Sequence, residues 1–234
     1  MNADDAVSHY TQLAAETRLQ RGADEPRWLE ERRASALASF TAGGFPTRKQ
    51  EGWRYTSLDK LLTQTFATPR EPAYRISQKS ISSLRTTDAE AVRLVFCDGH
   101  LVEPLSDINN LPDGIQISSL RDRLTSPSKQ VSEQLDRLFE NDYEGFDYIN
   151  TTLAKDGLWL EVEANVSLER PIEVIHTSQQ RDMGLLLVPR NLVILHPGAQ
   201  ATLIEHYSSP PGSTDFTNSV TEISLGADAK LEHY

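Results

Sequence analysis

The spacing of apolar residues along the chain changes at about residue 157, from a helical period to a period of two. Residues 4–20 carry an apolar stripe at three- and four-residue intervals, formed by Val7, Tyr10, Leu13 and Ala14. This stripe predicts an amphipathic helix. Pro26 and Gly43-Gly44 bound a second predicted helix, because proline suits the first turn of a helix and glycine suits the residue after its end.

A third helix is predicted after Thr56. Thr56 and Asp59 have the spacing of a capping box, in which side chains satisfy the free amides at a helix start. An apolar run at helical spacing follows, made of Leu58, Leu61, Leu62 and Phe66. Residues 1–66 are therefore predicted to form an N-terminal helical region.

Residues 67–154 give mixed signals and are predicted to form an α/β connector region. Residues 91–96 have the composition of a strand, and the Asp98-Gly99 pair that follows is a hairpin signal. Both residue types tolerate the left-handed backbone that a tight hairpin turn needs. Residues 131–154 return to a helical spacing and predict a helix.

From residue 157 the alternation of apolar and polar residues predicts short β-strands. They are expected at residues 158–166, 172–175, 185–188, 192–195, 201–204 and 220–225, separated by proline and glycine. The stretch from Gly198 to Tyr207 returns as Gly226 to Tyr234, which favours a β-helix in which equivalent coils stack in register. Aligning the two glycines leaves the Glu-His-Tyr endings one residue out of step, so we expect a bulge or a face switch in one copy.

The predicted fold class is therefore α+β, with an N-terminal helical region followed by a β-helix, a solenoid of short strands, over residues 155–234. A solenoid needs a cap on its last coil, and no cap follows the second repeat. We therefore expect the β-helix to be incomplete at its C-terminus and the chain to be the front part of a larger protein.

Charge and cysteine content narrow the class of protein. The formal net charge is −11, and Cys97 is the single cysteine. An acidic chain is a poor general binder of nucleic acid or of anionic membranes, because phosphates attract clustered lysine and arginine. One cysteine cannot form an internal disulfide and fits a reducing compartment. The N-terminus has no secretory or transit signal, and the apolar runs are too short to cross a bilayer, so we expect a cytoplasmic protein.

The repeat places two pairs of chemically active side chains at matching positions. His206 and His233 would share a metal if they stacked, and Glu205 and Glu232 would resemble the paired carboxylates of glycosidases. We favour the simpler interpretation of a side-chain ladder, because no further ligand and no separate acid or base is marked. Cys97 has no neighbouring catalytic histidine in the pattern and is interpreted as a buried apolar residue.

Trp53-Arg54-Tyr55 is the densest aromatic cluster in the sequence. Such a cluster suits ligand recognition through a cation–π contact or, as we favour, the anchoring of one part of the protein against another by large buried rings. The chain contains no P-loop, GxGxxG or GxSxG pattern. We therefore predict no catalytic, metal-binding or cofactor-binding residue in this sequence.

One stretch resembles the N-terminal signature of the SufD family, in which a proline and basic residues precede a Glu-x-Trp-Arg-Tyr-Thr core. It reads Phe45-Pro-Thr-Arg-Lys-Gln-Glu51-Gly-Trp53-Arg54-Tyr55-Thr56-Ser-Leu. Later segments are similar to that family in the same order: Val95-Phe-Cys-Asp-Gly99, Asn150-Thr-Thr152, Asp156-Gly-Leu-Trp-Leu-Glu-Val162, Glu169-Arg-Pro-Ile-Glu173 and the two repeats. The resemblance runs from about residue 40 to the C-terminus. We interpret the signature residues as structural; they are Glu51, Trp53, Arg54, Tyr55 and Thr56.

The resemblance implies a scaffold subunit for iron–sulfur cluster assembly and not an enzyme. SufD pairs through its β-helix with the related SufB, and each binds the ABC-type ATPase SufC through C-terminal helices. The family's cluster-related and SufC-binding residues lie beyond the position that matches Tyr234, so none is carried over, and no cofactor is expected in this portion. Two alternatives stay open: a SufB-like paralogue, whose N-terminal region is different and richer in cysteine, and a carbohydrate-active β-helix enzyme.

Overall fold

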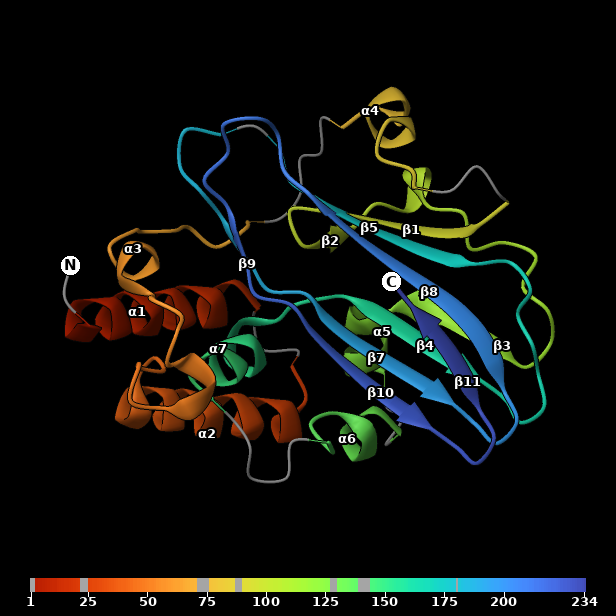
Figure 1. Ribbon diagram of the computed structural model, residues 1–234, viewed down its shortest axis with the longest axis horizontal. Coiled ribbons are helices and arrows are strands. Elements are labelled where there is room, and N and C mark those ends of the chain that lie inside the picture. The colour runs from red at the N-terminus through yellow and green to blue at the C-terminus, as the bar shows by residue number, and fades with distance from the viewer. Residues whose placement is uncertain are drawn as a thin grey trace.

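The computed structural model describes residues 3–21, 25–70, 76–86, 90–126, 130–138, 144–179 and 181–234. Figure 1 shows the N-terminal helices gathered on one side and the long strands of two sheets on the other. The fold is thus mixed α/β, with helices first and with parallel and mixed sheets after them.

Both long helices predicted at the N-terminus are confirmed. They are α1 (Ala3–Arg21) and α2 (Arg27–Gly43). Their buried faces meet through aromatic rings, with the ring of Tyr10 5.0 Å from that of Phe45 and the ring of Phe40 5.1 Å from that of Phe45. Gly44 ends α2 with a φ of 67°, and its amide donates to the Phe40 carbonyl oxygen at 2.7 Å. The left-handed backbone explains why glycine stands at this helix end.

The prediction of a capping box at Thr56 is wrong. The segment forms a 3-10 turn, η1 (Glu51–Trp53), and a single helical turn, α3 (Asp59–Leu62). Leu58 occupies the capping position and makes no side-chain capping bond. The nearest substitute is the Ser57 hydroxyl, which accepts from the Asp59 amide at 3.3 Å. The apolar run after Thr56 packs against α1 and α7 as an irregular segment and needs no long helix.

The remaining helices are short. They are α4 (Gln78–Ser82), the 3-10 helix η2 (Glu103–Leu105), α5 (Leu120–Thr125), α6 (Gln130–Gln134) and α7 (Gly145–Leu153). The helix predicted over 131–154 is therefore two helices, α6 and α7, and residues 139–143 between them lie outside the described residues.

The described strands form three sheets. The first sheet has the order β11 (Lys230–His233), β8 (Gln200–Ser208), β5 (Ile172–Thr177), β1 (Val92–Cys97) and β2 (His100–Leu101). The second sheet has the order β10 (Val220–Leu225), β7 (Arg190–Leu195), β4 (Leu158–Val162) and β3 (Ile115–Ser119). The third sheet pairs β6 (Leu186–Leu187) with β9 (Phe216–Thr217). The two large sheets take β1 and β3 from the region predicted as a connector.

The predicted hairpin is confirmed. Strands β1 and β2 pair antiparallel, with Cys97 opposite His100. The two turn residues, Asp98 and Gly99, have φ values of 51° and 76°. This left-handed pair matches the right-handed twist of the flanking strands, which is why Asp-Gly is a strong hairpin signal.

From β4 onward the chain alternates between the two large sheets, and each long strand after β4 pairs in parallel with the equivalent strand of the previous pass. Leu192 of β7 lies beside Trp159 of β4, and Leu203 of β8 lies beside Ile172 of β5. Lys230 of β11 lies beside Gln200 of β8. The partners in these pairs are separated by nearly equal lengths of chain, so successive passes stack on one another in a regular way.

The alignment of Gly198 with Gly226 that the sequence suggested is wrong, and so is the expected bulge or face switch, because β11 and β8 pair in continuous register. Asp228 is the residue that matches Gly198, because it follows Gly198 by the same interval that separates Lys230 from Gln200. Asp228 and Gly198 both have positive φ values, 58° and 73°. The glycine alignment failed because an aspartate fills the turn position in the last copy.

An equivalent turn occurs one pass earlier, at Asn165, whose φ is 63°. Asparagine, glycine and aspartate are the residues that accept this left-handed backbone most readily. The turn also ends the strand predicted over 158–166, which stops at Val162. The corner of each pass is therefore fixed by backbone conformation and not by one residue type.

Strand β4 is buried on both faces. All five of its residues are buried, since one face of the second sheet packs on the first sheet and the other is covered by helices. Trp159 on the outer face packs with Leu29 of α2 and with the short helices α5 and α6.

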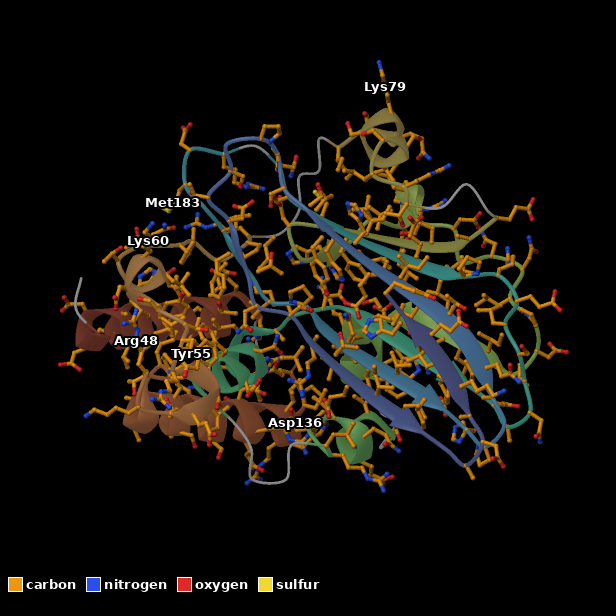
Figure 2. All side chains as sticks on the ribbon, in the orientation of Figure 1. Arg48, Tyr55, Lys60, Lys79, Asp136 and Met183 are labelled. Carbon is orange, nitrogen blue, oxygen red and sulfur yellow. The ribbon has the colours of Figure 1, made fainter. Side chains whose placement is uncertain are left out.

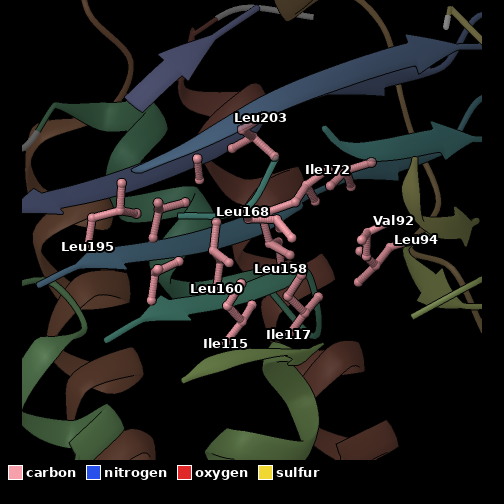
Figure 3. Close-up of a cluster of buried hydrophobic side chains, with 14 of the residues drawn as sticks. Val92, Leu94, Ile115, Ile117, Leu158, Leu160, Leu168, Ile172, Leu195 and Leu203 are labelled. Atoms are coloured by element: carbon pink, nitrogen blue, oxygen red, sulfur yellow. The ribbon is translucent and has the colours of Figure 1, made fainter. Parts of the chain in front are cut away.

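The main core lies between the two large sheets. Inward-facing aliphatic side chains from both sheets form it, among them Val92, Leu94, Ile115, Ile117, Leu158, Leu160, Ile172, Leu195 and Leu203 (Figure 3). Burying each such side chain stabilises the fold by about 1.5–3 kcal/mol. Among the clusters of described residues, this one therefore contributes the most stabilisation from apolar burial.

Helix α7 joins the N-terminal helices to the second sheet. The Asn150 amide donates to the Pro189 and Asn218 carbonyl oxygens at 2.9 and 2.8 Å, and its own oxygen accepts from Arg190 at 3.2 Å. On the other side, α7 touches the end of α2 so closely that a Cβ at Gly145 would lie 2.4 Å from the Gly44 carbonyl oxygen. In the part of the chain that the structure describes, no helix has the length and apolar character needed to cross a membrane.

Candidate functional site

The signature residues lie on a surface loop between α2 and α3. Glu51, Arg54, Tyr55 and Thr56 are exposed, and Trp53 is half-buried. The indole N–H of Trp53 donates to the Glu144 carboxylate, and its ring lies 5.3 Å from that of Phe146. Trp53 therefore ties the loop to the start of α7, which is the geometry of an anchor.

Arg54 and Tyr55 form the cation–π contact that the sequence suggested. The guanidinium carbon lies 5.5 Å from the centre of the Tyr55 ring. Tyr55, labelled in Figure 2, is 90% exposed, so this pair stands on the surface and not in a ligand cavity. The expectation that the rings of this cluster are buried is therefore wrong for Tyr55.

Glu144 also caps α7, which the sequence pattern had not led us to expect. It is the capping residue of α7, and its side chain accepts from the backbone of the first turn while the Asp147 side chain accepts from the Glu144 amide at 2.9 Å. This is a complete capping box in which glutamate and aspartate replace the usual residues. The Glu-x-x-Asp spacing before an apolar helix was the signal that could have found it.

A polar cluster lies between the two large sheets, around the buried carboxylate of Glu205. We call it the Glu205 cluster; its members are Asn191, Glu205, Tyr207, Thr221 and His233. The Glu205 side chain is only 6% exposed. One of its oxygens contacts Thr221 at 2.9 Å and His233 Nε2 at 3.0 Å, and the other accepts from Asn191 at 2.9 Å and from the Tyr207 hydroxyl. Strands of both large sheets thus converge on one carboxylate.

An aromatic stack extends the Glu205 cluster along the first sheet. The His176 ring lies 4.8 Å from the Tyr207 ring and 5.0 Å from the Phe96 ring, stacked on both. Burial lowers the pKa of His176 to about 4, although the nearby Glu205 carboxylate acts in the opposite direction. The His176 Nε2 atom has no hydrogen-bond partner among the described residues. His176 is therefore neutral at physiological pH.

The structure contradicts both stacked pairs suggested by the repeat. His233 lies beside Leu203 and Glu232 beside Thr202, so neither is next to its expected partner, His206 or Glu205. The carboxylate pair that motivated a carbohydrate-active enzyme does not exist. Asn191 and Thr221 were not predicted from the sequence either. Each is a polar residue at a position where the alternation of its strand calls for an inward apolar side chain, and this mismatch was the available signal.

The chemistry open to the Glu205 cluster is limited. All the contacts of Glu205 come from fixed neighbours, so a substrate or metal would have to displace existing hydrogen bonds. No group of three or more metal-ligating side chains occurs within the described ranges. Cys97 is buried, and burial raises the pKa of its thiol to about 12, which keeps it protonated and unreactive at neutral pH. The geometry is that of a structural polar core.

Two models of known protein families match consecutive parts of the chain. Residues 4–174 match the family model described as "SufBD protein N-terminal region", and residues 175–234 match "SUF system FeS cluster assembly, SufBD core domain". The boundary between the two matches falls within β5.

Two curated relatives are similar to this chain. "Iron-sulfur cluster assembly protein SufD" of Escherichia coli (strain K12) is 30% identical over 199 residues, which are 84% of this chain and 43% of that protein. "Iron-sulfur cluster assembly SufBD family protein slr0076" of Synechocystis sp. is 26% identical over 196 residues, 80% of this chain and 43% of that protein. The chain therefore spans less than half the length of each relative.

Replacing Trp53 by Phe tests the anchor. The variant keeps a ring beside Phe146 but loses the indole N–H that donates to Glu144, and a hydrogen bond to a charged group contributes about 1.5–3 kcal/mol. Because Trp53 is only half-buried, we expect the free energy of unfolding to fall by about 1 kcal/mol in urea titrations. Tyr55→Leu on the same loop is the control and should change it by less than about 0.5 kcal/mol. Equal effects of the two substitutions would refute the anchor.

The neutral His176 predicts a pH dependence of stability. Its pKa is about 4 in the folded protein and 6.5 in the unfolded chain, so between these values the unfolded chain binds more protons and acidification favours unfolding. Between pH 7.5 and pH 5 the wild type should lose about 2 kcal/mol more than His176→Phe, which keeps the ring stack but cannot titrate. Urea titrations at the two pH values measure this difference. Parallel losses in both proteins would show that His176 titrates normally in the fold.

Proposed function

The chain belongs to the SufBD family of the SUF system for iron–sulfur cluster assembly, and on this premise we propose that it serves as a SufD-type scaffold subunit. The observation that carries the proposal is the match to both regions of the family, one after the other, over residues 4–234. The similarity to a SufD protein over 84% of the chain supports the SufD type over the SufB type. The signature around Trp53 and the single cysteine favour the same choice.

We further infer that the stacked strands are the first coils of a β-helix. Each pass of the chain adds one strand to the first sheet and one to the second, and equivalent left-handed turns recur at Asn165, Gly198 and Asp228. The third sheet, β6 with β9, follows the same interval, since Leu186 pairs with Phe216. Coils of this kind offer a rigid surface for pairing with a related subunit.

The proposed role is non-catalytic and depends on partners. We propose that a SufB-like subunit pairs with the β-helix and that a SufC-like ABC ATPase binds to helices that follow the β-helix in the family. The protonated Cys97 and the saturated Glu205 carboxylate support a scaffold over an enzyme. No resident cofactor is proposed for these residues. The cytoplasm is the proposed location, because a lone free thiol fits a reducing compartment.

Affinity isolation from the native organism tests this function. An affinity tag is fused at the chromosomal gene to the N-terminus, so that the protein is recovered at its natural length, and the recovered proteins are identified and quantified by mass spectrometry. We expect one other SufBD-family protein and one ABC-type ATPase in amounts comparable to the bait, and their loss from a strain that expresses the tag alone. Recovery of the bait without an ATPase, or with a second copy of itself as its only SufBD partner, would contradict the SufD-type role.

A further inference from the structure

A cavity of about 710 Å³ opens at the seam between the N-terminal helices and the sheets. Its walls come from the end of α1, the start of α2, helix α5 and strand β2, together with Arg70 and Lys155. It shares no lining residue with the Glu205 cluster or with the signature loop, and the proposed scaffold role does not require such a cavity. Its volume is within the range of pockets that hold small metabolites and cofactors.

The charge of this cavity is opposite to that of the protein. Among the described residues, five cationic side chains line it, Arg21, Arg33, Arg70, Arg121 and Lys155, against two carboxylates, Glu16 and Glu25. The whole chain carries a formal net charge of −11. A local excess of arginine in an acidic protein concentrates anions at that place, because field lines focus in a cleft with low-dielectric walls.

Arg33 is buried and Arg21 is half-buried, and among the described residues the two share one carboxylate, Glu25, which lies 3.8 Å from Arg21 Nη1. Arg33 donates to Glu25 at 3.0 Å and to the Thr151 carbonyl oxygen at 3.0 Å, and Arg21 donates to the Thr152 carbonyl oxygen at 2.6 Å. Burial lowers the pKa of both guanidinium groups. The positive charge of Arg33 lowers the pKa of Arg21 further, and that of Arg190 lowers the pKa of Arg33. The Arg21 Nε atom is buried and has no acceptor among the described residues. An unsatisfied buried donor on a charged group is costly, so the positive charge of Arg21 is incompletely compensated at the cavity wall.

Two more arginines stand at the rim without partners. The side chains of Arg70 and Arg121 are exposed, and neither makes an ion pair or side-chain hydrogen bond within the described part of the chain. The planar guanidinium group binds phosphate through two parallel hydrogen bonds, so free arginines at a cavity mouth suit a phosphate group. Leu19, Leu29 and Leu124 with Pro26 supply an apolar wall beside this charge.

We propose that this cavity binds a small organic phosphate of nucleotide size. The phosphate lies among Arg21, Arg70 and Arg121, and the apolar wall receives a planar, weakly polar body. Inorganic phosphate alone would leave the apolar wall uncovered, and an uncharged nucleoside would leave the arginines unpaired. The ligand therefore has to combine both parts to bind well.

Isothermal titration of the whole chain with three probes tests the ligand class. The probes are AMP, inorganic phosphate and adenosine, each at low ionic strength and again at physiological salt. We expect AMP to bind at least about tenfold more tightly than either other probe, with an affinity that falls as salt rises. AMP that binds no more tightly than the better of the two fragments would overturn the proposal.

Paired variants test the location. Arg70→Ala/Arg121→Ala removes two exposed charges at the rim and should weaken AMP binding by about tenfold or more. Arg48→Ala/Lys49→Ala removes the same charge from two exposed residues that do not line the cavity, of which Arg48 is labelled in Figure 2, and should leave AMP binding within about twofold of the wild type, since exposed charges at a distance are screened. Leu19→Glu, at a residue that is 84% exposed, adds an anion to the rim and should also weaken binding without disturbing the fold. Equal losses in the rim and control variants, or wild-type binding by both rim variants, would place the site elsewhere.

Discussion

The fold depends on one buried polar network at the junction of helices and sheets. Arg190 of β7 contacts Glu222 of β10 at 2.5 Å, Asn150 of α7 at 3.2 Å and Asp136, which follows α6. Arg190 and Glu222 are almost fully buried. A buried charge without its partners costs several kcal/mol, so the two strands, α7 and the segment after α6 have to be in place together. The network makes the position of the helices a consequence of the strand stacking.

The stacking itself follows from a simple backbone rule. Every pass of the chain needs a residue in the left-handed conformation at the same corner, and Asn165, Gly198 and Asp228 provide it. Because the corner is fixed, the parallel strands keep one register. Their inward positions are occupied by the aliphatic residues of the main core and by the Glu205 cluster. The cationic cavity arises where this stack meets the ends of α1 and α2, because Arg21 and Arg33 have to reach the carbonyl groups at the end of α7.

Much of this organisation could be predicted from the sequence. The stripes on α1 and α2, the Asp98-Gly99 hairpin and the positions of most strands after residue 157 follow from local periodicity and turn chemistry. The strand register could not, because it is set by backbone conformation at corners where asparagine, glycine and aspartate are equivalent. The Glu205 cluster and the Arg190 network could not either, since their members come from several separate segments and no local pattern marks them. The signature around Trp53 gave the family before any site geometry was known.

Native-state amide hydrogen exchange tests most directly the claim that helices and stacked strands form one unit. Residues in α2, α7, β7 and β10 are the ones to compare, because the Arg190 network and α7 connect them. The account predicts that their slowest amides exchange through the same global opening and share one free energy, with a common dependence on denaturant. If amides of α2 and α7 exchange through an opening of much lower free energy than those of β7 and β10, the helices pack only weakly on the strands. That result would contradict the account.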